Sequence, residues 1–251
     1  MKKGFSLILV SLLALAVFAG CAKDAALYKN GTYTAAYDAR DSHGWKPVLE
    51  IVIEKGKIVS ATFDYVNAEG KLKSQDEGYA TMMKSVSGTS PAEASAVMVK
   101  SLLAAQNAEI DDVAGATHST DNFRALARAI LEQAKTGNTQ PVLLPMNDTY
   151  TAEDEADERG YKAKIMVTYE NGRIVKVVYD EFDKDGNPKR TNEAYNTSMK
   201  AKSGTSWAEA ALILEAALVN SQAADGVDTV TGATHETERF KTLAARAIGQ
   251  R

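Results

Sequence analysis

Cysteine and histidine are scarce in this sequence, with one cysteine and three histidines in 251 residues. A single cysteine, Cys21, cannot form an intramolecular disulfide, and beyond it the chain has no thiolate metal ligand and no cysteine nucleophile. His118 and His235 have only His43 besides them, so the histidines make no metal-binding set. Disulfides, thiolate metal centres and thiol chemistry are therefore not expected in the folded protein.

Positive charge is also in deficit, since 29 Lys and Arg residues face 33 Asp and Glu residues and the formal net charge is −4. An acidic surface argues against nucleic acid as a partner, because phosphate binding needs a basic face. The chain also lacks a GxGxxG dinucleotide fingerprint and any catalytic constellation that would support a complete reductase. With 45% hydrophobic and 25% charged residues, the composition is globular and the length suits about two domains.

The longest apolar run lies at the N-terminus, where "MKK" is followed by residues 5–18. This is the layout of a secretory signal, and the run is short for a membrane span. The sequence "FAGC" resembles a bacterial lipobox, with Phe18 where leucine is usual. The resemblance implies that residues 1–20 are a lipoprotein signal peptide, that Cys21 is acylated, and that residues 21–30 tether the chain to a membrane at the cell surface or in the periplasm. The alternative is an ordinary signal peptide with an incidental cysteine.

An internal repeat organises the rest of the chain, with an offset of about 117 residues. "TYTA" occurs at Thr32 and at Thr149, and "YATMMKSVSGTSPAEA" at Tyr79 matches "YNTSMKAKSGTSWAEA" at Tyr195. A repeat of this length indicates duplicated domains rather than a solenoid. We predict domain 1 over 31–135, a linker over 136–147 that holds two of the five prolines, and domain 2 over 148–251.

Each repeat carries local signals for strands and helices. Apolar and polar residues alternate over 48–53 and 58–65, and the second copy has Asn-Gly at the turn, which predicts an antiparallel hairpin. Capping boxes at Ser90 and Ser206 predict helix starts, and apolar residues recur at helical spacing from Phe123 and from Phe240. The expected fold class is α+β, with two homologous domains that each pack helices on an antiparallel sheet.

A short loop is repeated immediately before the last predicted helix of each domain, as "DDVAGATH" at 111–118 and "DTVTGATH" at 228–235. The pattern resembles the flavinylation signature of the FMN-binding domain family, roughly Asp-x-x-Ser/Thr-Gly-Ala-Thr. That family includes peripheral subunits of the sodium-pumping NADH:quinone reductase and Rnf complexes, and lipoproteins of extracellular electron transfer. The first copy departs from the signature, because Ala114 stands where the family prefers serine or threonine.

The resemblance implies that Thr117 and Thr234 each carry FMN through a phosphoester bond made by a flavin transferase that uses FAD. Glycine and alanine before each threonine (Gly115, Ala116, Gly232 and Ala233) would leave the backbone accessible, and the glycines would permit unusual torsions. Helix amides would face the phosphate, and the adjacent histidines would make contacts either within the loop or on the side of the phosphate. Asp111 and Asp228 would either order the turn or help the transferase hold its metal.

Other residues repeated in both copies are candidates for the pocket of the flavin ring. They are Tyr79, Met83 and Lys84 with Tyr195, Met199 and Lys200, and the "SGTS" turns at Ser87 and Ser203. Tyrosine and methionine four residues apart share a helix face, which is equally typical of plain core. The copies also differ, since Val86 corresponds to Lys202. A lysine near the ring would raise the potential of the second flavin, whereas a solvated lysine would leave the two flavins equivalent.

The predicted function is a membrane-anchored redox carrier that holds two covalent FMN groups and converts no substrate of its own. It would take electrons from a membrane-associated donor and pass them to a protein, a quinone-linked system or an extracellular acceptor. One alternative is a lipoprotein that captures free flavin reversibly. The other is a complete reductase with its own substrate site.

Overall fold

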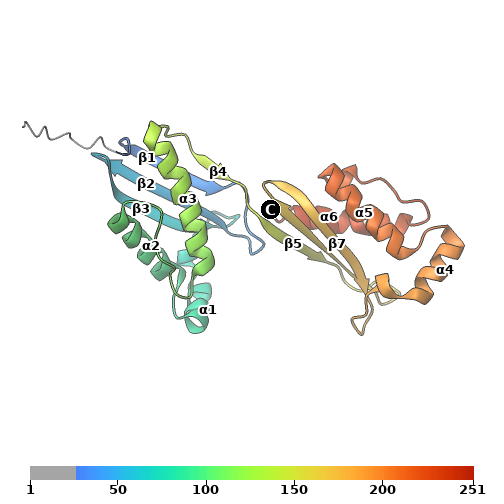
Figure 1. Ribbon diagram of the computed structural model, residues 1–251. Coiled ribbons are helices and arrows are strands. Elements are labelled where there is room, and N and C mark those ends of the chain that lie inside the picture. Colours follow the sequence, from blue (N-terminus) through green and yellow to red (C-terminus); the bar gives the residue numbers. More distant parts are fainter. Residues whose placement is uncertain (1–26) are drawn as a thin grey trace, which may run out of the picture.

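A computed structural model describes residues 27–251, so the predicted signal peptide and Cys21 lie outside the described residues. The chain folds into two α+β units, each built on its own sheet (Figure 1). In residues 27–251, no helix is both long enough and apolar enough to span a bilayer.

Domain 1 contains four strands and three α-helices. Its sheet has the order β3-β2-β1-β4, with β1, β2 and β3 antiparallel and β4 parallel to β1. The elements are β1 (Gly31–Tyr37), β2 (Lys46–Glu54), β3 (Lys57–Val66), η1 (Lys73–Gln75), α1 (Glu77–Ser87), α2 (Pro91–Ala105), α3 (Thr117–Thr136) and β4 (Val142–Leu144).

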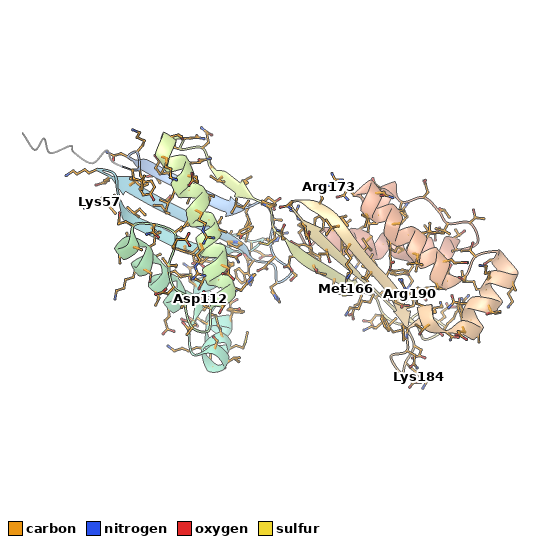
Figure 2. All side chains as sticks on the ribbon, in the orientation of Figure 1. Lys57, Asp112, Met166, Arg173, Lys184 and Arg190 are labelled. Atoms are coloured by element: carbon orange, nitrogen blue, oxygen red, sulfur yellow. The ribbon has the colours of Figure 1, made fainter. Side chains whose placement is uncertain are left out.

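Domain 2 repeats this plan on a three-stranded antiparallel sheet of order β5-β6-β7. In Figure 2, Arg173 marks the start of β7, and Lys184 lies in the loop that follows the end of this strand. The elements are β5 (Asp148–Glu153), β6 (Lys162–Glu170), β7 (Arg173–Phe182), η2 (Lys189–Thr191), α4 (Glu193–Ser203), α5 (Trp207–Ser221), η3 (Ala224–Gly226) and α6 (Thr234–Ile248).

The predicted hairpins are confirmed in both domains. Asn171 and Gly172 have φ values of 50° and 76°, and Lys55 and Gly56 have 51° and 74°. Positive φ at both central residues is the requirement of a type I′ turn, whose twist matches that of the flanking strands. Alternate residues of β2 and β6 are buried, so one face of each sheet lies on the core.

The predicted capping boxes are also confirmed. The side chains of Ser90 and Ser206 accept from the amides of Glu93 and Glu209, and each glutamate accepts from the amide of its serine. These reciprocal bonds satisfy amides that the first helical turn leaves free. They fix the start of α2 and α5, which pack on β3 and β7.

The last helix of each domain covers the sheet with its apolar face. α3 packs on β1 and β2, and α6 packs on β5 and β6. The residues predicted from helical spacing are at most 1% exposed, and they are Phe123, Leu126, Ile130 and Ala134 in α3 and Phe240, Leu243 and Ala247 in α6. Each domain therefore has its own hydrophobic cluster.

The segments predicted as tether and linker contribute to domain 1. Tyr28 is buried in its core, and the amide of Lys29 donates to the carbonyl of Ala134 at 2.8 Å. Within 136–147, β4 adds a short strand to the sheet of domain 1. This segment was expected to be a linker, but part of it is sheet because apolar residues 142–144 pair with the exposed edge of β1.

Candidate cofactor-binding site

The repeated loop has nearly the same backbone in both domains. Gly115 and Gly232 have φ values of 74° and 80°, a region that residues with a Cβ rarely adopt. Each glycine is the third residue of a tight turn, in which the amide of Ala116 donates to Val113 and the amide of Ala233 donates to Val230, both at 2.9 Å. The glycine expected from the motif is therefore required by the turn.

A buried threonine holds each loop in place. The hydroxyl of Thr120 donates to the carbonyl of Ala116 at 3.0 Å and accepts from the amide of Val113 at 3.2 Å. Thr237 makes the same two bonds in domain 2, at 2.9 and 3.2 Å. Both threonines are 0% exposed. Because each hydroxyl is enclosed and doubly bonded, these residues order the loop and are not accessible for modification.

The predicted attachment residues are accessible. Thr117 and Thr234 are exposed, and each is the first residue of its helix. The N-cap position before each is an alanine, which offers no side-chain bond to the helix amides. The start of α3 and of α6 therefore presents free amides beside an exposed hydroxyl, which is the environment that favours an anionic group.

The alanines and aspartates of the motif lie differently from what the sequence suggested. Ala116 and Ala233 were expected to keep the backbone open, but they are 5% and 1% exposed and pack into the hydrophobic clusters. Asp111 and Asp228 are exposed. Within residues 27–251, the turn-ordering bonds come from the buried threonines, which leaves both carboxylates directed to solvent.

A cavity of 460 Å³ opens beside Thr117 in domain 1. It is enclosed by the loop, by α1, and by residues from η1, from the end of β3 and from the segment after β1. The lining residues are Asp41, His43, Tyr65, Lys73, Tyr79, Met82, Met83, Val86, Ser87, Gly115, Ala116, Thr117, His118 and Ser119. The predicted pocket residues Tyr79, Met83 and Ser87 are thus brought together with the predicted attachment site.

The cation of this cavity is Lys73, which was not among the residues predicted from the sequence. Its Nζ lies over three aromatic rings, 4.4 Å from the centroid of Tyr79, 4.8 Å from Tyr65 and 5.6 Å from Trp45. Distances of this order are favourable for an ammonium on aromatic faces. The rings come from three separate segments, so no local pattern could have shown their convergence.

Aromatic rings surround Lys73 in this cage, and the carboxylate of Asp41 lines the same cavity. Tyr65 is 4% exposed, and burial raises the pKa of its phenol, against the opposing effect of hydrogen bonds from Ser119 and Asn122. Asn122 donates to the Tyr65 hydroxyl at 3.1 Å. The nearby carboxylate of Asp41 accepts from the backbone amides of His43 and Trp45 at 3.0 and 2.8 Å.

The equivalent lysine of domain 2, Lys189, has different neighbouring side chains. Lys189 lies 4.5 Å from the ring centroids of both Tyr161 and Tyr195, which correspond to Trp45 and Tyr79. Where domain 1 has Tyr65, domain 2 has Glu181, whose carboxylate lies 2.6 Å from Nζ of Lys189. Both side chains are 2% exposed.

Two further differences between the domains help to enclose Lys189 and its partner Glu181 in domain 2. Arg239 stands where domain 1 has Asn122, and its guanidinium lies 3.1 Å from Glu181 and 2.7 Å from Asp154. Trp207 of α5 is 1% exposed, with its ring 5.9 Å from Nζ of Lys189. Its indole Nε1 has no hydrogen-bond partner in the described chain.

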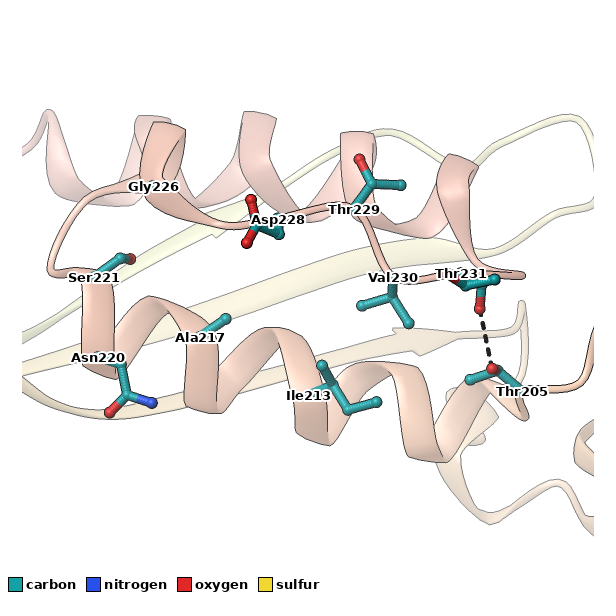
Figure 3. A pocket seen from close by; sticks show the side chains of 10 residues that line it. All are labelled: Thr205, Ile213, Ala217, Asn220, Ser221, Gly226, Asp228, Thr229, Val230 and Thr231. Atoms are coloured by element: carbon teal, nitrogen blue, oxygen red, sulfur yellow. Dashed lines mark hydrogen bonds between the residues drawn. The ribbon is translucent and has the colours of Figure 1, made fainter.

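A second depression, of 730 Å³, lies on another side of the loop in domain 2, between α5 and residues 226–231 (Figure 3). Thr205 bonds to the carbonyl of Thr231 at one end of it at 3.0 Å. Its charged side chain is Asp228, and Thr234 is not part of its lining. This groove therefore adjoins the motif but not the predicted attachment hydroxyl.

The predicted pocket lysines lie on the surface, away from the cavity lining. Lys84 and Lys200 are exposed and pair with the capping-box residues Glu93 and Glu209. Lys202 is also exposed, on α4. Tyr195 and Met199 pack against the hydrophobic cluster of domain 2. Of the two loop histidines, His118 lines the cavity, whereas His235 borders a different depression that includes Arg239.

The residues present in domain 1 fit a flavin nucleotide. A volume of 460 Å³ lies within the range of about 300–1,000 Å³ that is typical of small-ligand sites. Free helix amides and an exposed hydroxyl at Thr117 suit the phosphate, while Met83 and Tyr79 offer apolar and aromatic surface for a ring.

No family model matches the chain. Two solved structures resemble it in part. They are the CPE2226 protein of Clostridium perfringens, with 36% identity over 47% of this chain and 98% of that one and a TM-score of 0.46, and a protein of Clostridium thermocellum, with 26% identity over 41% of this chain and 89% of that one and a TM-score of 0.30.

A curated relative is the 15 kDa lipoprotein of Treponema pallidum (strain Nichols). It is 39% identical to this chain over 132 residues, which are 52% of this chain and 93% of the relative. The alignment thus spans nearly the whole relative but about half of the present chain, as expected where a domain is duplicated. The chain belongs to the family of this 15 kDa lipoprotein.

Proposed function

We propose that the protein is a membrane-anchored lipoprotein that carries FMN covalently on Thr117 and Thr234 and transfers electrons outside the cytoplasm. The anchor is supported by the "FAGC" sequence at Cys21 and by the name of the Treponema relative. The flavin is supported by the repeated motif and by the fit of the cavity. Electron transfer follows from the resemblance to flavin-bearing carriers.

The observation that carries the proposal is the contrast between two threonines of one loop. Thr117 is exposed beside free helix amides, whereas Thr120 is buried and doubly bonded. A transferase therefore has access to the hydroxyl that the motif assigns. In that reaction the threonine Oγ bonds to the FMN phosphorus of FAD, the phosphoanhydride bond breaks, AMP leaves, and the hydroxyl proton passes to solvent or base.

Covalent attachment suits a protein outside the cytoplasm, where a dissociable flavin would be diluted. A reversible site stays occupied only while free ligand exceeds its dissociation constant. A phosphoester on Thr117 or Thr234 removes that dependence. Such a chain would hold its redox groups whatever the free flavin concentration.

Coexpression with a flavin transferase, followed by intact-protein mass spectrometry, tests the attachment. We expect two FMN additions in the unaltered chain, one in Thr117→Ala or Thr234→Ala, and none in the double variant. Ser85→Ala, which removes an exposed hydroxyl outside the cavity lining, is the control and should retain both. Flavin that is released on denaturation would favour the reversible capture protein, and additions that persist in the double variant would exclude these two threonines.

Electron transfer is tested with the same proteins. The flavinylated chain, reduced anaerobically, should be reoxidised by a soluble ferric chelate, which is seen as return of the flavin absorbance. The double Thr→Ala variant should neither bleach nor recover. A reduced flavoprotein that is not reoxidised by ferric iron, quinone or a protein acceptor would contradict the carrier function.

A further inference from the structure

The two domains offer different surroundings to a ligand at the same place in the fold. In domain 1, Lys73 lies in its aromatic cage and lines the cavity together with Thr117. In domain 2, Lys189 is paired with Glu181 and is almost fully buried. In the described chain, an ion pair of this kind is formed by the second lysine and not by the first.

The helix at the mouth of the cavity differs in the same sense. Met82 and Val86 of α1 line the cavity and are 52% and 81% exposed. Their counterparts in α4 are Ser198 and Lys202. Large exposed apolar side chains beside a cavity indicate a surface that an apolar group covers. Domain 2 has no such need, because its counterparts are polar.

From these differences we infer that the cavity of domain 1 seats the flavin ring, with Lys73 as its cation, and that domain 2 fills the equivalent place with its own side chains. The inference rests on the proposed function for the identity of the ligand. A flavin on Thr234 would then lie outside the core of its domain. The two attachment sites would be alike, but the two ring environments would not.

The charges explain why Lys73 suits this ring. An ammonium without a carboxylate partner donates to carbonyl oxygens and favours negative charge in its neighbourhood. Glu181 removes this capacity from Lys189, and Arg239 adds a second cation that holds Glu181 in place. Dismantling such a buried cluster leaves charges unpaired at high cost, so a ligand does not readily displace it.

Titration of FMN into the chain without covalent flavin tests the inference. The full-length protein, made in a host that lacks a flavin transferase, is followed by calorimetry. We expect one FMN per chain. Lys73→Met should weaken binding about 10- to 100-fold, because hydrogen bonds to charged groups are strong and each tenfold is about 1.4 kcal/mol. Lys189→Met is the matched control and should leave the affinity and stoichiometry unchanged.

A second variant converts domain 1 to the pattern of domain 2. Tyr65→Glu with Asn122→Arg gives Lys73 the partners that Lys189 has, and should weaken FMN binding at least about tenfold while thermal unfolding remains cooperative. If this variant fails to fold, the comparison of Lys73→Met with Lys189→Met still tests the inference.

Three results would overturn the inference: two equal FMN sites, equal effects of Lys73→Met and Lys189→Met, or no FMN binding at millimolar concentration. The proposed function is judged separately. A chain that binds one FMN reversibly but never gains covalent mass refutes that function and still supports binding of the flavin ring in the cavity of domain 1. A chain that gains two covalent FMN groups but binds no FMN in the calorimetric titration before modification refutes only the binding of the flavin ring in the cavity of domain 1.

Discussion

Gly115 lies so close to the carbonyl oxygen of Ser87 that a Cβ at this glycine would be 2.2 Å from that oxygen. The same approach recurs in domain 2, where a Cβ at Gly232 would be 2.3 Å from the oxygen of Ser203. The motif loop is therefore packed against the last turn of α1 or α4. This contact explains why the "SGTS" turn and the "GATH" loop recur together in both copies.

Gly115→Ala should destabilise domain 1 much more than Gly88→Ala. Both glycines have positive φ, 74° and 79°, so both variants incur roughly 1–2 kcal/mol of backbone strain. Gly88 has no atom within 4 Å of an added Cβ, whereas Gly115 meets backbone that cannot yield, for about 1–3 kcal/mol more. Urea unfolding measures the difference, and equal losses for the two variants would contradict the contact.

Thr120→Val should cost about 1–3 kcal/mol of the free energy of unfolding. The change keeps the shape of the side chain but leaves the buried amide of Val113 without its acceptor. Thr117→Val, three residues earlier and exposed, should stay within about 0.5 kcal/mol of the unaltered chain. Paired chemical denaturation curves test this, and similar losses at both positions would show that the hydroxyl of Thr120 does not support the loop.

The start of α5 should lose stability in acid. The carboxylate of Glu209 accepts hydrogen bonds from Lys200 and from the backbone and side chain of Ser206. These bonds, the one from Lys200 most of all, lower the pKa of Glu209 from 4.5 to about 2. Because the folded-state pKa is depressed, this contribution is fully present above pH 4.5 and is lost as the pH falls towards 2. The stability difference between the unaltered chain and Glu209→Gln should therefore shrink over that interval.

Glu158→Gln provides the control for this pH experiment, since Glu158 is exposed in the loop before β6. Its stability difference should change less across the same interval. A difference for Glu209→Gln that stays constant from neutral pH to pH 2 would mean that the capping carboxylate does not titrate as its hydrogen bonds indicate.

Cys21→Ser should move the protein from the membrane to the soluble or secreted fraction. Acyl chains supply the anchor in the proposed lipoprotein, at about 0.8 kcal/mol per buried methylene. Fractionation and immunodetection measure the shift, with an exposed substitution such as Lys84→Ser as the control. Retention of a processed Cys21→Ser protein in the membrane would require a different anchor.

Local signals predicted the parts of the fold that depend on short stretches of chain. The Asn171-Gly172 turn, the Ser90 and Ser206 caps and the apolar face that begins at Phe123 each act within a few residues, and all are confirmed. Thr117 is exposed, and its role as an attachment site stays a prediction. Strand β4 escaped prediction because it is three residues long and gains its hydrogen bonds from β1, about 100 residues away along the chain.

The cage around Lys73 could not be predicted from a single copy of the repeat. Its rings come from β3, from α1 and from Trp45, the residue just before β2. Aligning the two copies does hold a signal. Tyr65 and Asn122 become Glu181 and Arg239, a simultaneous gain of opposite charges at two positions distant in the sequence. Such a paired change indicates contact in the fold, and the structure places these two side chains 3.1 Å apart in domain 2.

Strand β4 makes the connection between the domains a restrained segment rather than a flexible linker, because it is paired with β1. It pairs with β1 through Ala35, Ala36 and Tyr37, and the next residue, Asp38, accepts from the amide of Met146 and binds Arg251 at 2.8 Å. Strand and ion pair together restrain how far one domain can swing from the other. If both threonines carry flavin, the gap between the two redox groups is set by this restrained segment, and the rate of electron exchange across it should be insensitive to solvent viscosity.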